Sequence, residues 1–468
     1  MTLSAIPVEP IHRSHARRAE EEPAERRAAG KKLRESVPRK AHASWQAPVG
    51  RRDPVDLLVE TSAGRVKELL PIRYGRMMSS PFAFYRGGAA LMAADLGGTP
   101  STGIRVQACG DCHLVNFGGF ATPERRIVFD INDFDETLPA PWEWDLKRLV
   151  TSVVIASQHN GFDAADVREA ALMTARSYRR HMLAFSELKT LDQWYLSIDA
   201  EDLIDSIPSN KRREGIAKRI ERAEEKGLHA DPIPKLTEVL NGERVIKDSP
   251  PLIFHPQEMQ RPEFEQFFLD SFESYRNTLR PDRRELIDRF HVQDYAIKVV
   301  GVGSVGTRCG IVLMMAADDD PLFLQIKEAC ASVLAPYAGR SLFDNHGERV
   351  VQGQRLMQAA SDLFLGWSVG PKGHHFYVRQ LRDVKIKPLV DAFNPTRMKY
   401  YGGACGWALA RAHTKSGDAA SIAGYLGKSE RIDEAMVDFG VAYARQNEAD
   451  HQELLRAIRE GKIEARPD

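Results

Sequence analysis

The stretches CGDCHLVN (residues 109–116) and VFDINDFD (residues 128–135) decide how this chain is interpreted. Two short runs of β-type residues, 104–108 and 127–131, flank the polar loop that lies between them. Asp130 stands at the end of the second apolar run, where a buried carboxylate without a partner costs free energy. The pattern therefore favours a site built from carboxylates over an ordinary turn.

Asp111 precedes Asn116 by the spacing found in a protein-kinase catalytic loop. In such a loop the Asp accepts the proton of the attacking hydroxyl group, and the Asn side-chain oxygen holds magnesium. A second carboxylate must bridge the metal to the phosphates, and we predict that Asp130 supplies it. Asp111 is thus the predicted base, with Asn116 and Asp130 as Mg²⁺ ligands. An acidic loop and a calcium site are the alternative interpretations of the same run.

A glycine-rich motif, GVGSVG, lies far downstream at residues 301–306. A dinucleotide-binding loop of this pattern would lead directly into a helix, whereas β-type residues follow here. Strand, glycine loop, strand, turn and strand is the kinase arrangement, in which the loop covers the triphosphate. We therefore predict contacts with ATP from Gly301, Gly303, Ser304 and Gly306.

Lys327 ends the third β-type run and is predicted to contact the α- and β-phosphates of ATP. An exposed lysine at a strand end is the alternative interpretation. Its carboxylate partner is sought in a predicted helix over residues 346–365, where Glu348 lies near the start and no Glu lies at the centre. Other polar residues of that helix are Gln352, Gln354 and Gln358. Gln380 and Leu381 fall where a hinge to the adenine ring is expected.

The motif G-D-x-H-x-x-N, followed by an apolar pair with Asp and by PWEWDL at residues 141–146, resembles the aminoglycoside-phosphotransferase branch of the protein-kinase-like superfamily. The resemblance implies the roles given above for Asp111, Asn116 and Asp130. It adds Asp145 as the residue that braces the catalytic loop.

Most of residues 50–445 also resembles the bacterial DUF2252 family, a domain of unknown function. The matching stretches include SPFAFYRGGAALMAADL, CGDCHLVNFG, FDINDFDETLPAPWEWDLKRL, VRQLRDVK and LARAHTKSGD. Within them, Asp133 and Asp135 are further carboxylates for a second magnesium ion. Tyr85-Arg86 has two open interpretations, a contact with phosphate or substrate and a structural ion pair.

In ordinary kinases the glycine loop and lysine precede the catalytic loop, but here they follow it. We therefore expect an α+β, two-lobed, circularly permuted kinase-like fold, with residues 406–413 packed beside Asp111. The expected parts are a charged N-terminal extension (1–50), a helical catalytic lobe (51–290), a nucleotide-binding β lobe (291–385) and C-terminal helices that complete the catalytic lobe (386–468).

The 468 residues carry 65 basic and 65 acidic side chains, and this neutral balance argues against specific nucleic-acid binding. No apolar run approaches the roughly 20 residues of a membrane span, and the N-terminal sequence lacks an apolar signal core. Five cysteines suit a reducing cytoplasm better than a disulfide framework. Cys109 and Cys112 form one C-x-x-C pair without a second pair to complete a zinc site.

The sequence therefore predicts a cytoplasmic phosphotransferase that needs ATP and Mg²⁺ and acts on a hydroxyl group of a small molecule or protein. Nucleotide transfer is an open variant of this chemistry. One rival is an inactive, nucleotide-binding pseudokinase that acts as a scaffold. The other is a metal-dependent phosphohydrolase built on Asp130, Asp133 and Asp135.

Overall fold

The structure is a computed structural model, and it describes residues 21–205, 213, 236–256, 262–299, 301, 303, 305–317, 320–381 and 385–466. The fold is α+β, with many helices and several small antiparallel sheets, in agreement with the predicted class. Ser304 and all but one residue of the charged run 211–226 lie outside the described residues. No described helix is long and apolar enough to span a membrane.

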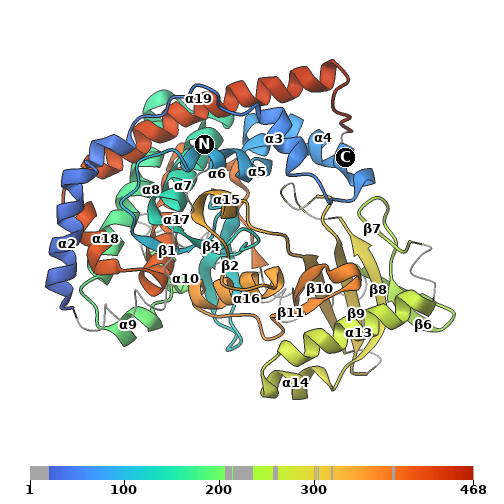
Figure 1. Ribbon diagram of the computed structural model, residues 1–468. Helices are drawn as coiled ribbons and strands as arrows, with labels where there is room; N and C mark the ends of the chain where they lie inside the picture. Colours follow the sequence, from blue (N-terminus) through green and yellow to red (C-terminus); the bar gives the residue numbers. More distant parts are fainter. Residues whose placement is uncertain are drawn as a thin grey trace.

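A large helical part occupies the left and top of Figure 1. Its first helices are α2 (Pro23–Ser36), α3 (Pro54–Glu60), α4 (Leu70–Met78), α5 (Pro81–Gly87), α6 (Ala89–Leu96), α7 (Trp142–His159) and α8 (Ala164–Phe185). The chain returns to it with α17 (Pro395–Ser416), α18 (Ala419–Leu426) and α19 (Arg431–Arg459). Shorter helices are α9 (Thr190–Tyr195), α10 (Ala200–Asp205), α14 (Pro281–Ile287) and α15 (Ala335–Ala338).

Helix α7 forms the centre of this part, because residues 142–157 are all buried. A helix that is covered on every side must be surrounded by other elements, and α8, α17 and α19 pack around it. Two glycines of α17 permit a close approach to α8. A Cβ atom on Gly402 would lie 2.3 Å from Thr174 Oγ1, and one on Gly406 would lie 2.3 Å from the Thr174 carbonyl oxygen.

The larger sheet lies at the lower right of Figure 1 and has the strand order β11-β12-β10-β9-β8-β7, with antiparallel pairing throughout. Its strands are β7 (Ile253–Phe254), β8 (His291–Lys298), β9 (Cys309–Met315), β10 (Pro321–Glu328), β11 (Gly366–Val369) and β12 (His375–Gln380). Helix α13 (Pro262–Thr278) packs on it through Tyr275, and α16 (His346–Met357) contacts β11 and β12. The predicted helix over 346–365 therefore ends earlier, at Met357.

Three smaller sheets complete the strands. They are the pair β1 (Arg105–Ala108) and β4 (Leu138–Pro141), the sheet β13 (Lys385–Ile386), β2 (Phe117–Ala121) and β3 (Ile127–Ile131), and the pair β5 (Thr237–Leu240) and β6 (Glu243–Ile246). The prediction of helix up to about residue 290 is wrong at β5, β6 and β7. Asn241 and Gly242 both have positive φ, 54° and 87°, and this Asn-Gly turn joins β5 to β6 as a hairpin.

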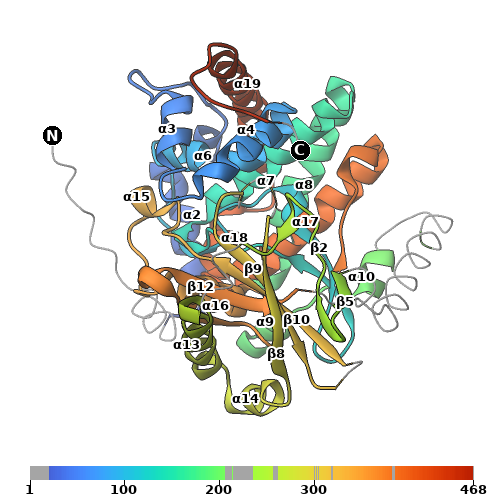
Figure 2. The same ribbon diagram turned by 90° about the vertical axis from the view of Figure 1, so that its right-hand side faces the viewer.

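The described part of the N-terminal extension is docked on the helical part. Helix α2 lies along α18, and a Cβ on Gly30 would stand 2.0 Å from the Ser421 carbonyl oxygen. Trp45 packs edge-on against Tyr443 and Phe439 of α19. In Figure 1, α2 and α18 lie at the left, away from the strands β8 to β10, so these helices lie behind the strands in Figure 2. The extension is therefore anchored by close backbone contact and one aromatic cluster.

Candidate functional site

The loop that contains Asp111 is held by the first turn of α7. Asp145 Oδ2 accepts a hydrogen bond from the Cys109 amide at 2.7 Å, and Oδ1 accepts one from Gly110 at 3.1 Å. Gly110 has a φ of 82°, and a Cβ there would lie 2.3 Å from the Glu136 carbonyl oxygen. This position therefore requires glycine, and Asp145 fixes the backbone that leads into Asp111.

Helix α17 supports Asp145 from the other side. His413 Nε2 lies 3.3 Å from Asp145 Oδ2, and the Tyr178 hydroxyl lies 2.9 Å from His413 Nδ1. All three side chains are buried. A chain segment from near the C-terminus therefore completes the support of a loop near residue 110.

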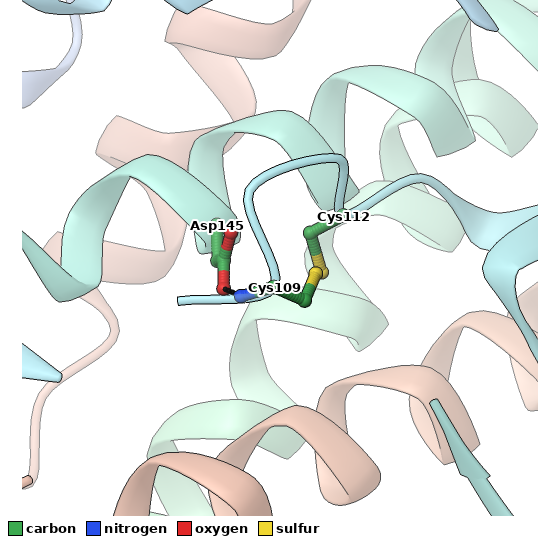
Figure 3. Close-up of side chains that lie close together, drawn as sticks. All are labelled: Cys109, Cys112 and Asp145. Atoms are coloured by element: carbon green, nitrogen blue, oxygen red, sulfur yellow. Dashed lines mark hydrogen bonds between the residues drawn. The ribbon is translucent and has the colours of Figure 1, made fainter. Parts of the chain in front are cut away.

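Cys109, Cys112 and Asp145 form a compact buried group (Figure 3). Their two sulfur atoms and one carboxylate oxygen all lie within 4.8 Å of one another. Burial raises the pKa of the Cys112 thiol to about 11 and that of Cys109 well above its usual value. Zinc requires thiolates, and both oxygens of Asp145 already accept amide hydrogens. These donors do not suit a zinc ion.

Arg148, also on α7, binds one oxygen of Asp111. Its Nε and Nη2 donate to Asp111 Oδ1 at 2.7 Å and 2.5 Å. The other oxygen, Oδ2, lies 3.8 Å from His113 Nε2. Burial raises the pKa of the Asp111 carboxyl, while the positive charges of Arg148 and Arg86 act in the opposite direction. Asp111 therefore keeps one oxygen for a further partner.

Asn116 ends a short 3₁₀ turn, η3 (Leu114–Asn116), directly before β2. Its Nδ2 donates to the Asp111 carbonyl oxygen at 2.8 Å, so its Oδ1 is the atom left to act as a ligand. The Asn132 amide donates to the Asn116 carbonyl oxygen at 2.8 Å. This bond extends the β2–β3 pairing by one residue, beyond Phe117 and Ile131.

Asp130 lies in the middle of a different network. Arg411 Nη2 donates to its Oδ1 and Oδ2 at 2.7 Å and 2.8 Å. The amides of Ile131 and Ala359 donate to Oδ1 and Oδ2 at 2.9 Å and 2.8 Å. The side chain is fully buried. Both oxygens of the predicted metal ligand are thus engaged by protein donors that tie β3 to α17 and to the end of α16.

Lys327 of β10 contacts Asp135. Its Nζ lies 2.6 Å from Asp135 Oδ2, and the Tyr377 hydroxyl donates to Oδ1 at 2.5 Å. Burial opposes both charges, but their mutual attraction outweighs it. The pKa of Lys327 is therefore raised well above its ordinary value, and that of Asp135 is held below its own. Asp135 is therefore the carboxylate partner of Lys327, in place of a residue of the helix over 346–365.

The polar residues of α16 have other roles. Gln354 Nε2 donates to Gln358, and Gln358 Nε2 donates to the Ile131 carbonyl oxygen at 2.7 Å. Arg349 donates to the carbonyl oxygens of Asp135 and Thr137 at 2.8 Å and 2.6 Å. Side chains of α16 therefore hold the main chain of residues 130–136, which we call the acidic segment.

Asp133 is half-buried, as are Asp135 and Glu136. Burial raises its pKa, and the nearby negative charge of Asp135 raises it further, against Lys327 and Arg379. The negative charge of Asp111 raises the pKa of Asp133 as well.

Two glycines of the 301–306 motif, Gly303 and Gly306, contact the helical part near Asp111. A Cβ on Gly303 would lie 4.0 Å from Asp111 Oδ2 and 3.7 Å from the Arg86 carbonyl oxygen. Gly306 has a φ of 87°, and its carbonyl oxygen accepts the Val66 amide at 2.7 Å. Gly301 is exposed. Gly303 therefore lies beside Asp111, and Gly306 is held against the helical part through Val66.

Gln380 and Leu381 end β12 next to β10. The Gln380 amide donates to Asp362 Oδ2 at 2.7 Å, and the Leu381 amide donates to the Phe323 carbonyl oxygen at 2.8 Å. Their side chains are half-buried. Both predicted hinge residues thus lie at the strand end that leads from the large sheet back to β13.

No curated protein and no solved structure matches this chain. A family model described as "Uncharacterized protein conserved in bacteria (DUF2252)" matches residues 65–457, which contain the loop of Asp111, the acidic segment, the glycine loop and Lys327. The match extends over most of the 468 residues. The chain therefore belongs to the DUF2252 family of bacterial proteins.

Proposed function

We propose that this protein is an ATP- and Mg²⁺-dependent phosphotransferase with a kinase-like site. The observation that carries the proposal is the convergence of Gly303, Lys327 and the acidic segment on the loop of Asp111. Gly303 lies beside Asp111, and Lys327 is paired with Asp135. A phosphate-covering loop, a lysine on the third strand and a catalytic Asp are the parts that phosphoryl transfer requires together.

Asp111 is the proposed base. Arg148 holds its Oδ1, which leaves Oδ2 on the side of the glycine loop. An acceptor hydroxyl placed there would give its proton to Oδ2 while its oxygen bonds to the γ-phosphorus. The bond from that phosphorus to the β–γ bridging oxygen breaks, and ADP leaves with the bridging oxygen. Nucleotide transfer would break the α–β linkage instead.

Magnesium suits the oxygens of Asn116 and Asp133. Asn116 Oδ1 is left for a ligand, and the raised pKa of Asp133 marks a carboxylate that would gain from a bound cation. Asp130 has less support as a ligand, because Arg411 and two amides occupy its oxygens. When bound, the ion would neutralise charge on the phosphates. Asp135 is engaged by Lys327 and Tyr377, which also weakens the phosphohydrolase alternative.

The proposed fold is a circularly permuted two-lobed kinase. Support comes from β8, β9 and β10, with a glycine loop between the first two and Lys327 on the third. Further support comes from His413 of α17, which contacts Asp145 beneath the catalytic loop although it lies far along the chain.

The decisive experiment measures binding of ATP–Mg²⁺ by calorimetry, together with transfer of γ-labelled phosphate to water and to a bacterial extract. We expect Asp111→Asn to bind ATP like the wild type and to lose about 10²- to 10⁴-fold in transfer rate. Lys327→Met is expected to weaken ATP binding.

Two results would redirect the assignment. Tight ATP binding with no transfer by the wild type would favour the scaffold. Phosphate release that is unchanged in Lys327→Met would favour a hydrolase. Exposed Arg180 of α8 provides the control, since Arg180→Gln lies outside the site and should change neither quantity.

A further inference from the structure

Arg86 lies in the last turn of α5 and is half-buried beside the catalytic loop. Its Nε is buried without a hydrogen-bond partner. No hydrogen bond or ion pair joins its guanidinium to any residue within the described part of the chain, and its Cζ lies 6.0 Å from the centroid of the Phe82 ring. Of the two interpretations left open for Arg86, the structural ion pair is therefore not found among these residues.

Three other buried arginines around the site each donate at least one hydrogen bond from the guanidinium, although Arg349 and Arg411 also have a buried Nε without a partner. Arg148 binds Asp111, Arg411 binds Asp130, and Arg349 binds main-chain carbonyl oxygens. A guanidinium stays charged even when it is partly desolvated, so a buried one needs acceptors. Arg86 carries this cost without a partner, and its difference from its neighbours points to an acceptor supplied from outside the chain.

Arg86 lies near Gly303 and near Asp111, the proposed base. The Arg86 carbonyl oxygen and Asp111 Oδ2 lie 3.7 Å and 4.0 Å from the place where a Cβ of Gly303 would stand. The positive charge of Arg86 lowers the pKa of Asp111 and that of His113. The negative charge of Asp391 in turn raises the pKa of Arg86. Gly303, the proposed base and the main chain of Arg86 are therefore neighbours, and the charge of Arg86 acts on the same carboxylate.

We propose that Arg86 binds a phosphate oxyanion next to Asp111. The inference rests on the proposed function and extends it to the recognition of charge at the acceptor side of the site. Two sources share this chemistry, the terminal phosphate of ATP and a phosphate group on the acceptor. A planar guanidinium can donate two parallel hydrogen bonds to either one.

The test uses the full chain with Arg86→Gln, Arg86→Lys and the control Arg180→Gln. Calorimetry at constant ionic strength measures binding of ATP–Mg²⁺, ADP–Mg²⁺ and inorganic phosphate, the last also on protein saturated with ADP. If Arg86 contacts the terminal phosphate, Arg86→Gln lowers affinity for ATP about 10- to 100-fold and leaves ADP unchanged. If it contacts the acceptor, the nucleotide affinities stay and phosphate binding to the ADP-bound protein falls by a similar factor.

The proposal is overturned if neither ATP-over-ADP selectivity nor phosphate binding differs between Arg86→Gln and Arg180→Gln. Arg86→Lys keeps a charge but not the paired donors, so it should give an intermediate loss and serves if the glutamine variant does not fold. Failure of the wild type to bind either nucleotide would reject the kinase assignment alone. Inorganic phosphate would then still test Arg86, and equal phosphate binding by wild type and variant would reject the anion site.

Discussion

Asp111 illustrates how neighbouring residues set the chemistry of one carboxyl group. Burial raises its pKa, whereas Arg148 lowers it and fixes one of its oxygens. A base must be ionised to accept a proton, so both effects matter for rate. Arg148 is a positioning residue in this scheme, because it acts through Asp111.

The pH dependence of transfer follows from these shifts. Since the pKa of Asp111 is raised, kcat/KM should fall with decreasing pH at a higher pH than an ordinary Asp would give. Arg148→Met removes a charge that lowers this pKa, so the acidic limb should move to still higher pH. The pH profile of phosphate transfer measures both. An acidic limb that does not move in Arg148→Met would contradict the proposed coupling.

Asp130 and Asp133 give a matched comparison of two carboxylates three positions apart. Asp130→Asn breaks a buried ion pair with Arg411 and should cost about 3–5 kcal/mol of unfolding free energy. Asp133→Asn removes a carboxyl whose pKa is raised by folding, so stability at neutral pH should be kept or increased.

Urea unfolding measures stability, and a titration of transfer rate against Mg²⁺ concentration measures metal use. Asp133→Asn should require much more Mg²⁺. The opposite result, a stable Asp130→Asn variant with weakened Mg²⁺ dependence, would return the ligand role to Asp130.

At the scale of elements, the contact between α17 and α8 decides whether His413 and Arg411 reach the site. A side chain on Gly406 would meet the Thr174 carbonyl oxygen at 2.3 Å, which no real Cβ tolerates. Gly403 lies on the same helix, but a Cβ there would be 3.4 Å from the Met173 side chain. The two glycines therefore differ in packing while sharing a helix.

Gly406→Ala is expected to separate the helices and to destabilise the protein by about 1–3 kcal/mol. Gly403→Ala should be neutral or should gain up to about 1 kcal/mol from helix propensity. Thermal and urea unfolding of both variants provide the measurement. Equal effects of the two substitutions would show that close helix contact does not govern this element.

At the scale of the whole molecule, the pair of Lys327 and Asp135 joins the large sheet to the acidic segment of the helical part. Either residue alone would leave a buried charge without its partner. Lys327→Met or Asp135→Asn should therefore cost about 3–5 kcal/mol singly. The double variant should recover part of that loss, so a double-mutant cycle in urea should give a favourable coupling energy. Additive losses would mean that the two parts are held together without this pair.

The sequence by itself determined several of the local elements and predicted the residues that are proposed to carry chemistry. The apolar runs gave β1, β3, β8, β9 and β10, because strand patterns depend on neighbouring residues. Spacing selected Asp111 and Asn116 as candidates, and the end of a strand-like run downstream of the glycine motif selected Lys327. Spacing could not choose between Asp130 and Asp133, because that choice depends on Arg411, which lies far away in the chain.

Only the tertiary structure decided which partners these residues have. The predicted helix that follows Lys327 has no Glu at its centre, and the fold instead supplies Asp135 from a distant segment as its partner. The sequence left the role of Arg86 open between a contact with phosphate or substrate and a structural ion pair. In the structure it is half-buried near Asp111 without a bonded partner in the described chain, and this favours the phosphate contact as the role to test. The reason is physical, since desolvation and charge pairing depend on distances in space, whereas a sequence pattern records only distances along the chain.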